Sequence, residues 1–176
     1  ANLKGICTAP EAIEQTPVTY DLVYQLPWME SKPDVATWVA NYTVARYGKD
    51  NAVVKEAWDL LRRGPLNYST DAIQGPVEDV WAARPNLDAL PASSWGKTLS
   101  AKLTDEAGSL TPGSIYTVAR RQMLIDAVYK LLDQEEELDL TDGSIYESNY
   151  NYDIVEFGSA VMADYAHDLL LGIKAA

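Results

Sequence analysis

The sequence contains one cysteine, Cys7, and one histidine, His167, among its 176 residues. A single cysteine excludes an internal disulfide framework, and the two residues together are too few for a zinc site of the usual Cys/His kind. We therefore expect neither a metal nor a cofactor. Cys7 follows the apolar Ile6 and has no histidine near it in the sequence, which favours a small buried apolar group over a nucleophile.

Basic residues and long apolar runs are also scarce. Lysine and arginine number 14 against 26 aspartates and glutamates, so the net charge is -12. Because a nucleic-acid binder must neutralise phosphates, this charge argues against nucleic acid and against anionic membrane surfaces as partners. No apolar run reaches the roughly 20 residues of a membrane-spanning helix, so we expect no membrane insertion.

Apolar side chains at helical spacing are what the sequence does have. Hydrophobic residues make up 47% of the chain, which is enough to bury a core. The spacing predicts a mainly α fold, an irregular bundle of about five helices joined by long loops. Positions 3–10 read like the end of a strand that runs into a loop, so a short extended segment is expected at the N-terminus.

Capping residues and helix breakers predict where the first three helices begin and end. The first runs from Thr16 to Pro27, the second from Asp34 to Gly48, and the third from Asp50 to Gly64.

The second half of the chain predicts two further helices. Residues 66–100 read as a long loop, after which Ser114 caps a long helix. The acidic run Glu135-Glu136-Glu137 is interpreted as a solvated face in preference to a metal site. A tyrosine-rich turn is predicted over 146–152, followed by a last helix from near Asp153 to about residue 171.

The tryptophans favour packing over sugar binding. Trp28, Trp38 and Trp58 lie at helix ends or on apolar stripes, where aromatic side chains dominate core burial. Trp81 and Trp95 are expected to pin the long loop to the core, although aromatic platforms also bind sugar faces.

Two carboxylates, Glu11 and Glu14, lie in a short segment between the strand-like start and the first helix. Loops at strand ends often carry catalytic groups. Acidic residues in front of a helix also stabilise its positive end, and from composition alone that interpretation is favoured.

At this point the sequence resembles the α-N-acetylglucosaminidases of glycoside hydrolase family 89. The matching motifs follow the family order along most of the chain and are Ala9-Pro10-Glu11-Ala12-Ile13, Thr16-Pro17-Val18-Thr19-Tyr20-Asp21-Leu22, Gln25-Leu26-Pro27-Trp28, Trp38-Val39, Arg46-Tyr47-Gly48, Ala57-Trp58-Asp59-Leu60-Leu61, Arg84-Pro85-Asn86-Leu87 and Tyr152-Asp153-Ile154-Val155.

The resemblance implies a role for Glu11 as the nucleophile of a retaining glycosidase, while Glu14 stands at a variable position and inherits no role. The family usually has glycine where this sequence has Ala12. Because glycine permits backbone angles that alanine does not, the backbone conformation at this position is expected to differ. Retaining enzymes need a second carboxyl group about 5 Å away. By the resemblance this acid/base group lies in a preceding barrel domain and is absent from this chain.

The resemblance also sets the expected organisation. Residues 1–15 would be the edge of a (β/α) barrel catalytic domain, and residues 16–176 an incomplete helical C-terminal domain. The intact parent would be an exported exo-acting hydrolase, secreted, periplasmic or lysosomal, that acts on terminal α-linked N-acetylglucosamine. We expect the isolated chain to be inactive, and the sequence assigns no substrate-binding residue within it.

One alternative from another functional class stays open. The chain can be a stand-alone helical binding or scaffold module, whose acidic surface and loop aromatics meet a protein or glycan partner. The ordered run of family motifs favours the hydrolase.

Overall fold

The computed structural model describes residues 4–9, 16–67, 118–141 and 143–175. In these ranges the secondary structure is helical and no strand is present, which confirms the expected mainly α fold. Residues 4–9 form neither a helix nor a strand. No helix in the described ranges is long and apolar enough to cross a membrane.

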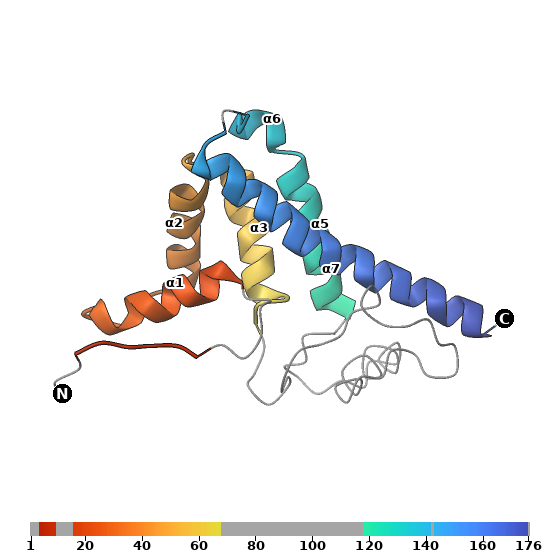
Figure 1. Ribbon diagram of the computed structural model, residues 1–176, viewed down its shortest axis with the longest axis horizontal. Helices are drawn as coiled ribbons and strands as arrows, with labels where there is room; N and C mark the ends of the chain where they lie inside the picture. The colour runs from red at the N-terminus through yellow and green to blue at the C-terminus, as the bar shows by residue number, and fades with distance from the viewer. Residues whose placement is uncertain (1–3, 10–15, 68–117, 142, 176) are drawn as a thin grey trace.

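Three helices lie in one layer and the last helix crosses them (Figure 1). Helix α3 (Ala52–Arg63) packs between α2 (Val35–Tyr47) and α5 (Val118–Leu132). Helix α7 (Ile145–Ala175) contacts both α2 and α5, and its C-terminal part continues beyond them. Helix α1 (Pro17–Gln25) lies across one end of this layer and leads into the short 3₁₀ helix η1 (Leu26–Trp28).

Helix α2 begins and ends where the sequence predicts. The Asp34 side chain accepts a hydrogen bond from the backbone N–H of Thr37 at 2.8 Å, which satisfies a free donor of the first turn. Gly48 ends the helix with φ of 72°, a left-handed conformation that favours glycine. A Cβ atom at Gly48 would lie 2.9 Å from the ring of Tyr146, so the tyrosine also requires glycine here.

The cap of α3 corrects the prediction by one residue. Asn51, not Asp50, is the N-cap, and its Oδ1 accepts hydrogen bonds from the backbone N–H groups of Val53 and Val54 at 2.9 and 3.0 Å. Asparagine and aspartate cap helices about equally well, so residue type alone did not decide between the neighbours. Asp50 instead pairs with Lys55 on the surface.

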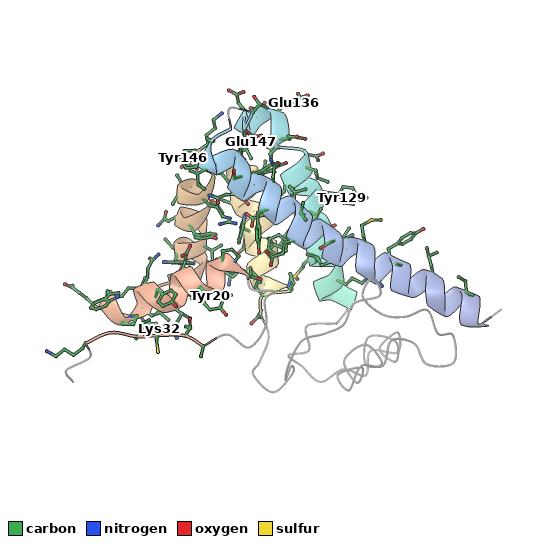
Figure 2. The ribbon with its side chains drawn as sticks, in the orientation of Figure 1. Tyr20, Lys32, Tyr129, Glu136, Tyr146 and Glu147 are labelled. Carbon is green, nitrogen blue, oxygen red and sulfur yellow. The ribbon has the colours of Figure 1, made fainter. Side chains whose placement is uncertain are left out.

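The acidic run after α5 is solvated, as predicted. It forms most of a single helical turn, α6 (Glu135–Leu138), in which the three glutamates are exposed and Leu138 is buried. Figure 2 shows Glu136 at the same end of the molecule as Tyr146 and Glu147, where α7 begins. Ser114, the expected cap of α5, lies outside the described residues.

The tyrosine-rich turn predicted over 146–152 is wrong, because these residues form the first turns of α7. Ser144 and Glu147 match the spacing of a capping box. The Ser144 hydroxyl accepts from the backbone N–H of Glu147 at 3.3 Å, and the Glu147 carboxylate accepts from the N–H of Gly143 at 2.6 Å. This local signal starts the helix eight residues before the predicted start at Asp153.

The core lies where α2, α3, α5 and α7 meet. Trp58 is buried there, as predicted, and the half-buried Trp38 stacks on Tyr42 with ring centroids 5.5 Å apart. The core prediction is wrong for Trp28, which is 68% exposed in the short helix η1, where no residue is buried. Trp81 and Trp95 lie outside the described residues.

Candidate functional site

Glu11, the predicted nucleophile, lies outside the described residues, as do Ala12 and Glu14. The described chain resumes at Thr16, directly before α1. The described candidate site therefore consists of Thr16, the residue that it contacts on α7, and the residues that hold that contact in place.

Thr16 stands at the predicted N-cap position, but its hydroxyl makes no hydrogen bond within α1. It donates instead to Glu156 Oε1 on α7 at 2.8 Å, across 140 residues of sequence. The backbone carbonyl of Thr16 accepts from the N–H of Thr19 at 3.1 Å, which starts the helix. The residue thus joins the start of α1 to the middle of α7.

A buried ion pair lies one helical turn before Glu156. Asp153 is 1% exposed and accepts two hydrogen bonds from the Arg46 guanidinium, one from Nε and one from Nη2 at 2.7 Å. Tyr47 donates its hydroxyl proton to Asp153 Oδ2 at 2.7 Å, and the same hydroxyl accepts from Trp58 Nε1 at 3.0 Å. We call Arg46, Tyr47, Trp58 and Asp153 the Asp153 cluster.

The electrostatics of the Asp153 cluster suit a structural clamp. Burial raises the pKa of Asp153, whereas the hydrogen bonds from Arg46 and Tyr47 lower it. Burial also raises the pKa of Tyr47 well above its usual value. Because both carboxylate oxygens are engaged by donors of α2, the group is committed to joining α2 to α7. Asn149 adds a further link, since its Nδ2 donates to the Arg46 carbonyl at 2.9 Å.

Glu156 lies one turn after Asp153 and accepts fewer hydrogen bonds than Asp153 does. Burial raises its pKa, while hydrogen bonds with Thr16 and Tyr152 lower it. Its Oε2 atom is buried and has no hydrogen-bond partner in the part of the chain that the structure describes. Glu156 therefore interacts with Thr16 and Tyr152 and still has one buried oxygen without a hydrogen-bond partner in the described part of the chain.

No group of three or more histidine, cysteine, aspartate or glutamate residues is placed to hold a metal ion within the described ranges. The side chain of His167 lies outside them. Cys7 is exposed, which corrects the expectation that it is buried. Residues 4–9 are not part of the helical layer, so an apolar side chain there is not enclosed by the core residues.

Sequence reasoning named Thr16 as a cap and Asp153 as a helix start, but it did not single out Glu156. A local signal was present, because Asp153 and Glu156 are two carboxylates on successive turns of one helix. Their partners, Arg46 and Thr16, are more than 100 residues away in the sequence.

Comparison with known proteins places most of the chain in one family. Residues 38–176 match the family model described as the alpha-N-acetylglucosaminidase (NAGLU) C-terminal domain. The human protein alpha-N-acetylglucosaminidase is 34% identical over 96 residues, which are 54% of this chain and 13% of the human protein. The match thus spans well under two thirds of that relative. No solved structure matches the chain significantly. Since the family match covers more than half of the sequence, including α2, α3, α5 and α7, the chain belongs to the family of alpha-N-acetylglucosaminidase C-terminal domains.

Proposed function

We propose that this chain is part of an exo-acting retaining glycoside hydrolase that removes terminal α-linked N-acetylglucosamine. In this proposal the helical domain packs on a catalytic barrel of the same polypeptide and contributes Glu11 to the active site. The observation that carries the proposal is the family match over residues 38–176. The Ala9-Pro10-Glu11 run that resembles the family's nucleophile segment lies shortly before that match.

The proposed chemistry divides the reaction into two displacements. The Glu11 carboxylate attacks the anomeric carbon while a second carboxylic acid protonates the leaving oxygen, and a covalent glycosyl-enzyme forms. The second group then takes a proton from a water molecule as this water attacks the anomeric carbon. The bond to Glu11 breaks, and the sugar is released with its configuration retained. That second group belongs to the barrel in this proposal. The isolated chain is therefore expected to show no useful turnover.

An exposed apolar face supports packing against a further domain. Met162, Tyr165, Leu169 and Ile173 follow helical spacing on α7 and are 51–58% exposed. Side chains of this kind mark contact surfaces when they gather in one place. The exposed Trp28 of η1 adds a second apolar site near the start of the helical part.

Hydrolysis of an aryl α-N-acetylglucosaminide tests the proposal. We expect activity in a longer protein that includes the barrel, and none in the 176-residue chain. Glu11→Gln in the longer protein is expected to abolish turnover, because the amide is not a nucleophile. Glu14→Gln is the matched control, since it makes the same change three residues away at a position without an assigned role, and it should leave turnover near that of the parent.

Three outcomes would contradict the proposal. Turnover by the isolated chain would show that no second domain is required. An active Glu11→Gln protein would remove Glu11 from the mechanism. Absence of activity in every protein, including the longer parent, would favour the alternative of a helical binding or scaffold module.

A further inference from the structure

The contact between Thr16 and Glu156 connects the start of the described helical chain to its last helix. The two oxygen atoms lie 2.8 Å apart in a partly buried position. Thr16 could have capped α1 with the same hydroxyl, yet no such cap bond is present. The hydroxyl thus donates to a tertiary contact, while its oxygen accepts no cap bond from α1.

The Glu156 end of this contact lies between two buried residues of α7, Asp153 and Phe157. Asp153 precedes Glu156 by one turn and is fixed to α2 by the Arg46 guanidinium and the Tyr47 hydroxyl. Phe157 follows Glu156 directly and packs edge-on against Trp58 with ring centroids 5.8 Å apart. Because these two neighbours are buried, the backbone of Glu156 is held in place on α7, and its carboxylate offers Thr16 a fixed acceptor.

The Thr16 end bears on the proposed nucleophile through the covalent chain. Glu11 precedes Thr16 by five residues, and five residues span at most about 17 Å when fully extended. Any restraint on Thr16 therefore restricts the region of space that the Glu11 carboxylate can reach. A restraint that ties Thr16 to α7 also fixes this region relative to the helical domain.

We propose that Thr16 and Glu156 are positioning residues, which fasten the segment that carries the proposed nucleophile to the clamped part of α7. This inference rests on the proposed function. Neither residue touches the substrate. Their hydrogen bond acts by holding the attacking carboxylate at the correct distance and orientation from the anomeric carbon. The rate of displacement depends steeply on this geometry.

The first test uses Thr16→Val in the longer glycosidase. Valine keeps the shape of threonine and removes the donor, so kcat is expected to fall about tenfold, which corresponds to about 1.4 kcal/mol in the activation free energy. KM should stay within about twofold, because substrate contacts are unchanged. Thr16→Ser, which keeps the hydroxyl, should restore most of kcat. Thr19→Val makes the same change at an exposed position of α1 and should have no effect.

Failure of this inference and failure of the proposed function give different results. If Glu11→Gln abolishes turnover while Thr16→Val leaves kcat unchanged, the positioning role is wrong and the nucleophile stands. If Thr16→Ser is impaired as much as Thr16→Val, the hydrogen bond is not the cause and the inference is likewise overturned. An active Glu11→Gln protein overturns both.

A second measurement does not depend on activity. In the 176-residue chain, Thr16→Val, Glu156→Ala and the double variant are compared by thermal unfolding. If the two side chains act through one bond, the double variant should show a midpoint shift no larger than that of the more affected single variant. Additive shifts would show that the two residues act independently and would refute the proposed role of the Thr16–Glu156 hydrogen bond.

Discussion

Among the side chains of α7 that the structure describes, the buried ones all lie in the first half of the helix, although Ile145 and Val155 there are 67% and 69% exposed. In the first half Tyr150, Asp153 and Phe157 are 5% exposed or less. In the second half Met162, Tyr165, Leu169 and Ile173 are each more than half exposed. The helix is continuous from Ile145 to Ala175, so the difference is not one of secondary structure.

The difference shows what helical periodicity can and cannot predict. A stripe of apolar residues indicates that a helix forms and which face seeks a partner. Whether that face is buried depends on the neighbouring element, which is α2 and α5 for the first half. The second half continues beyond this layer, as Figure 1 shows, and its Met162, Tyr165, Leu169 and Ile173 are exposed to solvent.

Asp153→Ala should have the largest effect on stability. Removal of the carboxylate leaves the buried Arg46 charge without its partner, and breaking a buried pair in this way costs about 3–5 kcal/mol. Urea unfolding measures the loss. Asp59→Ala is the control, because Asp59 pairs with Arg62 and Arg63 on the surface and should cost under about 1 kcal/mol. Equal losses of unfolding free energy in the two variants would show that the Asp153 cluster does not hold α2 and α7 together.

Truncation of one large side chain in each half sharpens the comparison directly. Phe157→Ala should lower the free energy of unfolding by about 3 kcal/mol, because it removes a buried ring and leaves a cavity. Leu169→Ala should change it by less than about 0.5 kcal/mol, as is usual for exposed positions. A large effect at Leu169 would mean that the second half is covered in solution.

Serine to alanine changes compare the start of α7 with its middle at a smaller scale. Ser144→Ala should cost about 1 kcal/mol, because the hydroxyl accepts from the N–H of Glu147 at the start of α7. Ser159 lies farther along the same helix and is exposed, and its hydroxyl donates only to the Glu156 carbonyl within the helix. Ser159→Ala should therefore be neutral within about 0.5 kcal/mol. Thermal unfolding of both variants measures the difference, and a costly Ser159→Ala would contradict the comparison.

The smallest expected effect is a pH dependence at the border between the halves. Burial raises the pKa of Glu156 in the folded protein. The folded state therefore holds the proton more tightly than the unfolded chain. The stability linked to this group is complete below the unfolded pKa and is lost as pH rises through the folded pKa.

Glu156→Gln removes this titration. The stability of the glutamine variant relative to the parent should thus increase as pH rises from about 4, near the unfolded pKa of glutamate, toward neutrality. Unfolding midpoints at several pH values measure the trend. A difference that is constant with pH, or one that falls, would show that Glu156 is not held in a setting that disfavours its charge.

Local chemistry could be predicted from the sequence, and distant contacts could not. Asp34 and Gly48 bound α2 as expected because a cap depends only on a few neighbouring residues. The sequence does not predict the start of α7 at Ile145, although Ser144 and Glu147 have capping-box spacing, since the tyrosine-rich segment around them is interpreted as a turn. The pairing of Arg46 with Asp153 spans 107 residues, and helical periodicity carries no information about it.

The candidate site divides in the same way. The family and its helical domain followed from ordered motifs and agree with the family match over residues 38–176. The role of Glu11 stays a prediction, because its segment lies outside the described residues. Glu156 became a candidate only when folding brought it to Thr16, a contact that neither residue's own neighbourhood predicts.

The hydrogen bonds through the Tyr47 hydroxyl all run in one direction, from Trp58 to Tyr47 and from Tyr47 to Asp153. The indole of Trp58 can only donate and the ionised carboxylate of Asp153 can only accept, so the one proton of the phenol must point from Tyr47 to Asp153. No other arrangement of protons satisfies the three groups. A slip of α7 along α2 by one turn, about 5.4 Å, would bring no equivalent set of donors to the carboxylate. The cluster therefore encodes the register of the two helices, which a purely apolar contact between them would leave far less strictly defined.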